Sequence, residues 1–450
     1  MLIADDLGFG DPGFRGGSAR TPRLDALAAE GLELPRFYTQ PVCTPTRASF
    51  FTGRRPERMQ LHDAALLPWA TKGLPAEEVT LAERLRDAGY ATRLVGKWHL
   101  GHARRAHLPN AQGFERFTGA LFGGDHYTRM HLGGYDLQQD GARLEREGYS
   151  SSLFADELVR AIETRDPARP LFLVGAFTAV HDPYQAPPEL VERYAGLERP
   201  RLRVYAAMLE ALDASVGRVL DALERAGIAR ETLLVFFGDN GGVRRVGRNE
   251  PLRGAKTDVF EGGIRSPALL RWPGVLPRGA RSEQVIAAAD LFPTLLRAAG
   301  LPAQAPGAPR LDGVDLLDAL RSGRPRAREP LFFGVRDLHG PDYAVIDGRH
   351  KLVRLAPRKR PRSEARLELL FDLGADPNEE RDLARERPEL RARLSLALDA
   401  WLRGRPSPLG GNPRSAPPGW SPAPDWSDLA RAGEEHAISR PRFLRAARSD

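Results

Sequence analysis

The chain has 450 residues, which is enough to bury a large core and to form more than one domain. Hydrophobic residues make up 42% and charged residues 28%, a balance that excludes a disordered or fibrous chain, and the absence of any run of 18 apolar residues excludes a membrane-spanning helix. The net charge is +7, but the arginines are spread along the chain without a basic run interleaved with aromatic residues, so we expect no nucleic-acid partner.

The chain begins abruptly, because Met1 leads directly into "LIADD", which has the pattern of the end of a strand. We therefore expect further residues upstream, including an export signal. With such a signal the protein would be periplasmic or secreted, and without it cytoplasmic. The single cysteine, Cys43, cannot form an intrachain disulfide, so cysteine usage does not decide the compartment.

Apolar strand-like runs alternate with helical patterns over residues 1–325, which predicts an α/β domain with a large, mostly parallel sheet sandwiched by helices. The first helix is expected to start at Pro22 after Thr21 and to stop at Gly31. A second helix is expected in "TLAERLRDAG" at residues 80–89, where Thr80 and Glu83 form a capping box at its start. Further helices are predicted at 151–164 and 203–227, and buried strands at 91–96, 170–177, 232–238 and 267–272.

The composition turns to Pro, Gly, Ala and Arg around residues 301–330, which marks a domain boundary. Beyond it, short strand patterns at 329–337, 343–356 and 367–373 precede a helical pattern at 388–404. These predict a small C-terminal α+β domain of antiparallel sheet plus helix over residues 326–404. Residues 405–450 are too rich in proline for regular structure and are predicted to form an extended tail.

Polar side chains follow four of the predicted strands of the large sheet. Because ligands bind beyond the carboxyl ends of the strands in an open parallel sheet, we expect these side chains to converge at one edge. They are Asp5 and Asp6, then Lys97 and His99, then His181, and finally Asp239 and Asn240.

The two acidic pairs offer only oxygen ligands, which suits Ca²⁺ or Mg²⁺ better than zinc. Taken alone, each pair would more often cap a helix or form a turn. Both pairs stand at strand ends with glycines following, in "DDLGFGD" and "DNGG", and this favours a metal site formed by Asp5, Asp6, Asp239 and Asn240.

The chain has five lysines against 61 arginines, and two of them, Lys97 and Lys256, lie inside glycine-rich motifs. Such lysines are expected where a compact ammonium is needed, as in holding a tetrahedral anion. His99 and His181 would add acid/base capacity. The ordinary interpretation, a half-buried hydrogen-bonding histidine, is kept for seven of the other histidines, although His126 or His339 would also be placed to shape the approach of a substrate. Those seven are His62, His102, His107, His126, His131, His339 and His350.

The stretch "CTPTRASFFTGRRP" at residues 43–56 resembles the signature of the formylglycine-dependent sulfatases, Cys-x-Pro-x-Arg followed by a TGRRP tail. The resemblance extends over residues 3–300 through "IADDLGFGD", "VGKWHLG", "VHDPYQAP", "GDNGG" and "PLRGAKTDVFEGG". Within the family, the chain is most similar to the arylsulfatase B (N-acetylgalactosamine 4-sulfatase) group. The resemblance implies an alkaline-phosphatase-like fold.

The resemblance implies that a formylglycine-generating enzyme oxidises Cys43 to an aldehyde, whose hydrate is the nucleophile that attacks sulfur. One hydroxyl accepts the sulfate and the other re-forms the aldehyde as sulfate leaves. One calcium ion, with magnesium the less expected alternative, would be held by the hydrated aldehyde at position 43 together with Asp5, Asp6, Asp239 and Asn240.

The resemblance also assigns roles to the basic residues. Arg47 would stabilise the hydrated aldehyde with the help of Lys97. Lys97 and Lys256 would hold the sulfate group. His181 would protonate the leaving alcohol, and His99 would help to expel the sulfate.

The expected function is therefore hydrolysis of an anionic sulfate ester, of a sulfated sugar or of an aryl alcohol. A phosphonate or phosphate ester hydrolase on the same scaffold is the first alternative. The second is a catalytically silent protein that binds sulfated glycans, which would follow if Cys43 were not oxidised.

Overall fold

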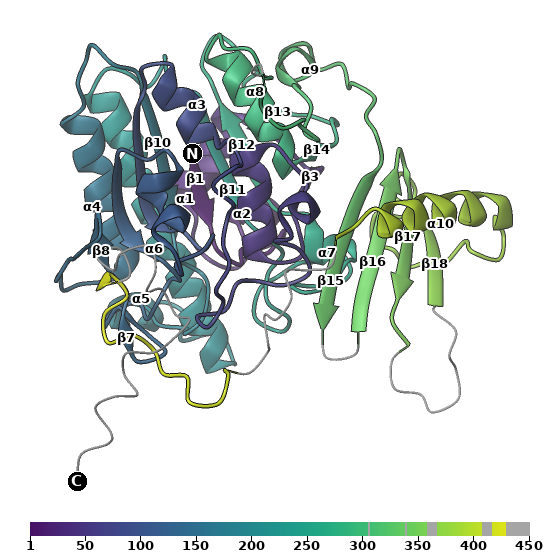
Figure 1. Cartoon of the computed structure of the whole chain (residues 1–450), viewed down its shortest axis with the longest axis horizontal. Helices are drawn as coiled ribbons and strands as arrows, with labels where there is room; N and C mark the ends of the chain where they lie inside the picture. Colours follow the sequence, from purple (N-terminus) through teal and green to yellow (C-terminus); the bar gives the residue numbers. More distant parts are fainter. Residues whose placement is uncertain (305–306, 338–339, 358–366, 407–415, 429–450) are drawn as a thin grey trace.

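The computed structural model describes residues 1–304, 307–337, 340–357, 367–406 and 416–428, which form a large unit and a smaller one beside it (Figure 1). Of the described helices, none is both long and apolar enough to cross a membrane. The large unit is built on one sheet whose ten described strands run in the order β13 (Ala280–Arg281), β2 (Leu32–Glu33), β12 (Ala268–Arg271), β11 (Leu234–Gly238), β1 (Leu2–Ala4), β10 (Leu171–Ala176), β4 (Ala91–Lys97), β5 (Arg116–Ala120), β8 (Gln138–Gln139) and β9 (Ala142–Arg143).

The five central strands, β11, β1, β10, β4 and β5, are parallel to one another, as predicted. Towards the edges the sheet becomes mixed, because β12 runs antiparallel to β11 and β8 antiparallel to β5. Three of the central strands, β1, β10 and β11, carry only apolar residues and glycine, as expected for strands whose two faces are both covered by helices. Two small pairs accompany the sheet: β3 (Phe37–Tyr38) with β14 (Ile286–Ala287), and β6 (Met130–His131) with β7 (Gly134–Tyr135).

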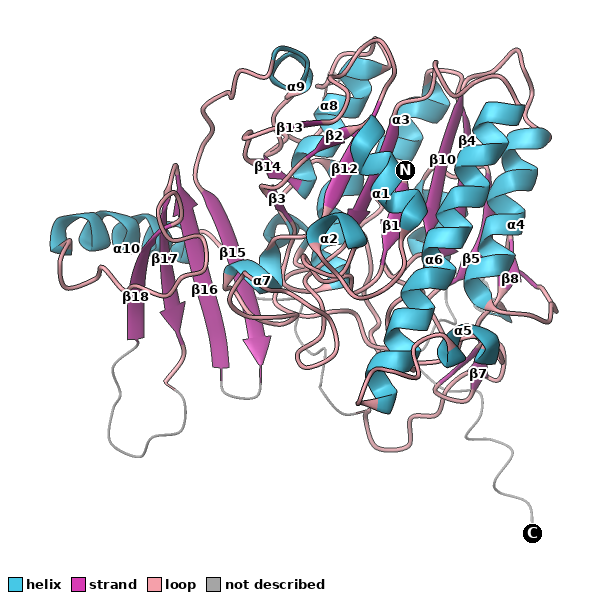
Figure 2. Cartoon of the chain, turned by 180° about the vertical axis from the view of Figure 1, so that it is seen from behind, coloured by secondary structure: helices cyan, strands magenta, loops and turns pink. Residues whose placement is uncertain are grey.

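Helices pack on both faces of the large sheet, and Figure 2 shows α1, α4 and α6 on one of them. That face is covered by α1 (Pro22–Glu30), α4 (Ser150–Glu163) and α6 (Pro200–Arg225), and the other by α2 (Cys43–Thr52), α3 (Leu81–Asp87) and α8 (Leu291–Ala298). The expected start and stop signals are present, including Pro22 in the first turn of α1 and the Thr80–Glu83 capping box of α3. Shorter helices are α5 (Pro188–Glu192), α7 (Glu261–Ile264) and α9 (Leu317–Ser322), with 3₁₀ turns at Gly13–Arg15, Pro56–Met59, Arg105–His107, Pro109–Gln112 and Ala288–Asp290.

The smaller unit is an antiparallel sheet of β15 (Leu331–Asp337), β16 (Gly340–Asp347), β17 (His350–Leu355) and β18 (Leu367–Asp372), with α10 (Pro388–Arg403) packed on its outer face (Figure 1). It is joined to the large unit by a fully buried ammonium. Lys351 Nζ lies 2.9 Å from Glu261 Oε1 in α7 and 2.8 Å from Glu379 Oε1. The predicted domain boundaries at 325 and 404 stay predictions.

Residues 416–428, within the predicted tail, pack against the large unit without regular secondary structure. Trp426 is 2% exposed and belongs to the core under α2 and α3, and the Trp420 ring lies 5.4 Å from that of Trp69. The chain therefore returns to the large unit after leaving α10 (yellow in Figure 1).

Glu57 is a buried carboxylate whose oxygens have no hydrogen-bond partner among the described residues. Burial raises its pKa to about 7, against the opposing charges of Arg405 and Arg55. Because the folded protein then binds this proton more tightly than the unfolded chain, the contribution of Glu57 to stability is greatest below the ordinary glutamate pKa. It falls by up to about 3 kcal/mol as the pH rises to about 7.

We expect Glu57→Gln to remove most of this loss, which urea unfolding measured between about pH 4.5 and 8 will detect as a flatter profile. The exposed Glu77→Gln serves as the matched control and should keep the wild-type slope. A Glu57→Gln profile as steep as that of the wild type would contradict the assignment.

Candidate active site

The register of the parallel strands brings the predicted site residues to one edge of the large sheet. Ala4 lies opposite Gly238, and Ala176 lies opposite Gly96. The residues that follow these positions therefore emerge side by side. They are Asp5 and Asp6 after β1, Asp239 and Asn240 after β11, Lys97 at the end of β4, and His181 in the loop after β10.

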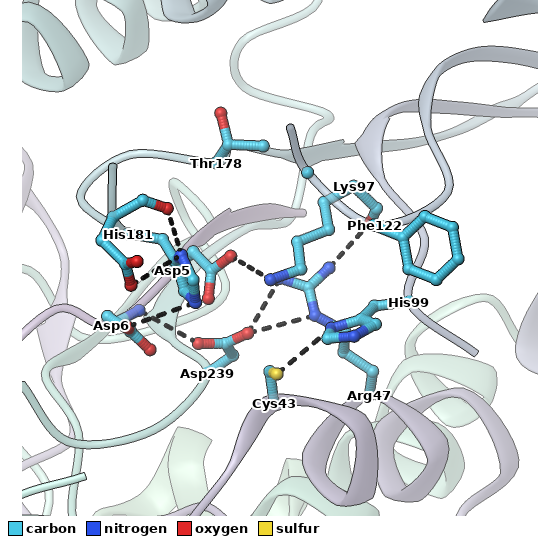
Figure 3. A network of polar contacts seen from close by, with 12 residues as sticks. Asp5, Asp6, Cys43, Arg47, Lys97, His99, Phe122, Thr178, His181 and Asp239 are labelled. Carbon is cyan, nitrogen blue, oxygen red and sulfur yellow. Dashed lines mark hydrogen bonds and ion pairs between the residues drawn. The ribbon is translucent and has the colours of Figure 1, made fainter. Parts of the chain in front are cut away.

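Ion pairs and hydrogen bonds connect these side chains with Arg47 of α2, which Figure 3 shows beside Asp239, and with Lys256 in the loop before α7. The pairs are Lys97 Nζ to Asp5 Oδ2 at 2.5 Å, Lys256 Nζ to Asp6 Oδ1 at 2.8 Å, and Arg47 Nη2 to Asp239 Oδ2 at 2.8 Å. Asn240 Nδ2 donates to Asp6 Oδ1 at 2.8 Å. The three carboxylates are fully buried, so each is matched by a cation.

Cys43 is the first residue of α2, and its Sγ lies 3.2 Å from Nδ1 of His99. His99 Nε2 lies 2.9 Å from the carbonyl oxygen of Leu66. Since a carbonyl only accepts, Nε2 carries the proton and Nδ1 faces Cys43 as a free base. Burial, followed by the charges of Lys97 and Arg47, lowers the pKa of His99 well below its ordinary range and keeps the ring neutral.

The thiol of Cys43 is itself a poor nucleophile. Burial raises its pKa even though the charges of Lys97 and Lys256 act in the opposite direction. Thiol reactivity depends on the thiolate, which is scarce under these conditions. The surroundings of Cys43 therefore do not activate the unmodified thiol as a thiolate.

His181 is the most exposed of the predicted site residues, with 28% of its side chain accessible. Its Nδ1 lies 2.6 Å from the carbonyl oxygen of Asp182 and therefore donates to it. Its Nε2 lies 3.7 Å from Asp6 Oδ2 and is the nitrogen left to exchange a proton with a bound molecule. His126 helps to hold the backbone of His181 in place, because His126 Nε2 lies 3.1 Å from the backbone oxygen of His181.

Oxygen atoms without a partner point to a missing cation. Asp5 Oδ1 and Asn240 Oδ1 are buried and have no hydrogen-bond partner among the described residues, a costly state unless something binds them. Ligand atoms of Asp5, Asp6 and His181 also lie within 4.8 Å of one another. The oxygen-rich donor set fits a hard divalent cation.

Two of these residues adopt backbone conformations that only glycine tolerates without strain. Asp6 has a φ of 62° and His99 a φ of 61°. Left-handed conformations at non-glycine residues cluster where a site requires a particular side-chain direction. Here they turn the Asp6 carboxylate towards Lys256 and the His99 ring towards Cys43.

All ten predicted site residues thus belong to one network, but several supporting residues escaped prediction. His126 is buried and bonds to Ser150 Oγ as well as to the backbone oxygen of His181, so it supports a site residue, and its role in the approach of a substrate stays a prediction. His131 and Phe122 lie close by without any sequence signal to mark them. His339 lies outside the described residues.

Comparisons with known proteins agree on one family. The family model named Sulfatase matches residues 1–301. Arylsulfatase J of Mus musculus is 36% identical over 349 residues, covering 75% of this chain and 58% of that relative. N-acetylgalactosamine-6-sulfatase of Canis lupus familiaris is 36% identical over 363 residues, covering 74% of this chain and 67% of that relative. The match therefore spans less than two thirds of the length of arylsulfatase J.

Among solved structures, Ps i-CgsB in complex with k-i-k-neocarrahexaose is similar over the whole chain. The TM-score is 0.82 at 26% sequence identity, covering 100% of this chain and 99% of that one. The similarity therefore includes the smaller C-terminal unit as well as the large sheet.

Proposed function

Because the chain belongs to the sulfatase family, we propose that it hydrolyses sulfate monoesters with a formylglycine made from Cys43 and a bound calcium ion. The single observation that carries the proposal is the environment of Cys43. It stands in a Cys-x-Pro-x-Arg motif at the start of α2, beside a neutral histidine and two ammonium groups, at the edge of the sheet that carries the buried carboxylates.

The sulfatase family generally uses formylglycine and a divalent metal. Formylglycine, when hydrated, supplies a nucleophilic hydroxyl and a second hydroxyl on the same carbon. Arg47 is fully buried with its guanidinium between Asp239 Oδ2 and the backbone oxygen of Lys97. Arg47 thereby holds the start of α2, where residue 43 lies, close to the carboxylate of Asp239.

The cation would be held by Asp5, Asp6, Asp239 and Asn240, with the oxygen of the modified residue 43 as a further ligand. A bound divalent cation lowers the pKa of a coordinated hydroxyl and draws charge from sulfate oxygens. Calcium is favoured over zinc because the set is dominated by oxygen atoms, and the unpartnered Asp5 Oδ1 and Asn240 Oδ1 supply two of them.

Lys97 and Lys256 hold the sulfate group in this proposal. Both ammonium groups remain charged, since the buried carboxylates that they contact, Asp5 for Lys97 and Asp6 for Lys256, raise their pKa values against the opposing effect of burial. Fixed positive charge in a buried site stabilises the negative charge that moves onto the sulfate oxygens and the leaving oxygen.

The two histidines move protons at different atoms. His181 Nε2, the accessible nitrogen, donates a proton to the leaving alcohol oxygen. His99 Nδ1, which faces residue 43, accepts the proton of the hydroxyl whose deprotonation lets sulfate leave. The Leu66 carbonyl holds the tautomer of His99 that makes this possible.

The proposed substrate is a sulfated sugar, with an aryl sulfate as the alternative. One relative is named for removing 6-sulfate from N-acetylgalactosamine, and one similar structure holds a neocarrahexaose. Both support a sugar as the alcohol part of the substrate. A phosphonate or phosphate ester hydrolase is the less supported alternative, because the relatives that match over most of the chain are named as sulfatases.

Mass spectrometry of the tryptic peptide Phe37–Arg47 tests the proposal, on protein made with and without a formylglycine-generating enzyme, which we propose as the maturation partner. The expected result is an aldehyde at position 43 and sulfate release that rises with the aldehyde fraction. A thiol that persists despite a competent maturation enzyme would instead favour the glycan-binding alternative. Sulfate and phosphate esters of the same leaving group, compared by kcat/KM, separate the two hydrolases.

Calcium is expected to stabilise the folded protein. A ligand that binds only the native state adds about 2.7 kcal/mol at 100 times its dissociation constant, which for this chain should raise the Tm by a few degrees. Differential scanning calorimetry with added calcium, magnesium or zinc measures the shift. We expect the largest shift with calcium and its loss in Asp6→Asn, while Asp221→Asn on the exposed side of α6 keeps it. An equal or larger shift with zinc would contradict the choice of ion.

A further inference from the structure

The segment of residues 122–135, between β5 and β8, surrounds three of the predicted catalytic side chains. The Phe122 ring lies 6.4 Å from that of His99 and is seen beside it in Figure 3. A Cβ on Gly123 would stand 3.5 Å from Lys97 Cδ, and His126 Nε2 contacts the backbone of His181. The charges of Lys97 and His181 also reach His131.

This segment carries an unusual concentration of exposed apolar side chains. Among the described residues, five large hydrophobic side chains are exposed, and three of them fall within six positions here. Tyr127 is 39% exposed, Met130 38% and Leu132 55%. Exposed apolar groups clustered next to a charged site mark a surface that binds a ligand.

The C-terminal segment of residues 416–428 holds residues 122–135 in place. The Trp426 ring packs edge-on against Phe122 at 4.8 Å, and its Nε1 donates to the backbone oxygen of His131 at 3.2 Å. The Phe122 ring is also stacked on the His131 ring, with 4.9 Å between their centroids. Tyr135 exchanges backbone hydrogen bonds with Pro424 and Trp426, each at 2.9 Å.

The contact is so close that residue 134 must be glycine. A Cβ there would stand 2.1 Å from the backbone oxygen of Ala423 and 2.6 Å from Trp426 Nε1. Trp420 of the same segment packs on Trp69. Trp69 lies in the loop that includes Leu66, whose carbonyl orients His99. The C-terminal segment thus connects two loops that flank Cys43.

We propose that residues 122–135 bind the sugar that carries the sulfate through Tyr127, Met130 and Leu132, and that Trp426 positions this surface over the site. The inference rests on the proposed function and extends it to the alcohol part of the substrate. A pyranose ring presents an apolar C–H face, which suits exposed aromatic and aliphatic side chains that are continuous with a sulfate-binding site. A small aryl sulfate is too short to need this surface.

Leu132→Ser tests the contact, since an exposed side chain can be changed without harm to the fold. Two substrates are compared. The small one is 4-nitrophenyl sulfate. The large one is either k-i-k-neocarrahexaose or a 6-sulfated chondroitin disaccharide, and the one that the wild type desulfates faster is used. We expect KM for the large substrate to rise about tenfold, as for loss of one good apolar contact, with kcat and the 4-nitrophenyl sulfate kinetics unchanged. Leu396→Ser, at the 66% exposed Leu396 of α10, is the matched control and should change neither.

Trp426→Ala and Trp426→Phe test the positioning role. Trp426→Ala should raise KM for the large substrate as Leu132→Ser does, and Trp426→Phe, which keeps a ring against Phe122, should restore most of it. If Trp426→Ala fails to fold, Gly134→Ala replaces it in the test. This variant opens no cavity, and it should raise KM for the large substrate in the same way. Trp272→Ala, at the opposite end of the sheet, controls for a general loss of stability.

The outcomes separate the two proposals. No release of sulfate from 4-nitrophenyl sulfate by matured protein would remove the proposed function itself. Normal hydrolysis of 4-nitrophenyl sulfate with no activity on either sugar would overturn only the present inference. So would unchanged sugar kinetics in Leu132→Ser, or equal losses on both substrates in every folded Trp426 and Gly134 variant.

Discussion

Cys43→Ser is expected to lower turnover of every sulfate ester by about 10⁴-fold or more, the scale seen when a nucleophile that works with its partners is removed. The serine hydroxyl has one oxygen where the hydrated aldehyde has two on one carbon, so a serine that accepts sulfate has no second hydroxyl with which to release it. Steady-state sulfate release and equilibrium binding of a sulfate monoester measure the two effects.

Binding should survive in Cys43→Ser because Lys97 and Lys256 are untouched, and the fold should be retained because sulfur is replaced by a smaller atom at the start of α2. Ser49→Ala is the matched control. It removes a buried hydroxyl from the same helix, one that donates to the Pro45 carbonyl at 2.9 Å, and should keep activity. Turnover by Cys43→Ser at a rate near that of the wild type would exclude the proposed nucleophile.

His181→Ala is expected to lower kcat/KM for sugar sulfates by about 10²- to 10⁴-fold and for 4-nitrophenyl sulfate by less than about tenfold. The reason is the leaving group. A sugar alkoxide is a strong base and needs a proton as the ester bond breaks, whereas 4-nitrophenolate is stable without one. A series of aryl sulfates with different leaving-group pKa values should give a steeper dependence in the variant.

The His350→Ala variant, in the smaller unit, controls for loss of an imidazole and should match the wild type on all substrates. Equal losses on good and poor leaving groups in His181→Ala would mean that His181 does not act as the acid. Its position beside Asp5 and Asp6 would then favour a ligand role for this imidazole.

The central part of the fold was accessible from local patterns. Continuous apolar runs predicted the buried strands, and Pro22, Gly31 and the Thr80–Glu83 box marked helix ends, because strand burial and helix capping depend on residues near one another in the chain. The mixed edges of the sheet were not predicted. β12 runs antiparallel to β11, and its direction depends on the path of the long loop that joins the two strands. The hydrophobic periodicity of the sequence carries no information about that path.

The candidate site was accessible for a related reason. Each strand end carries its own short polar motif, and the parallel arrangement of the strands makes those ends coincide. The supporting residues could not be found in this way. Lys351 lies in no recognisable motif, and its burial between Glu261 and Glu379 requires the smaller unit to dock on α7.

The amino-acid sequence by itself determined three things: the α/β class, the family signature around Cys43, and the ten residues that gather at the sheet edge. Each of them depends on a contiguous motif or on the order of the strands. The tertiary structure alone decided which groups orient them: the backbone carbonyl of Leu66 for His99, the His126 ring for His181, and the Trp426 ring for the segment beside the site. Trp426 and His131 are 295 residues apart in the chain. Contacts at such separations are selected by the packing of the whole molecule, and a proline-rich stretch gives no local sign of where it will dock.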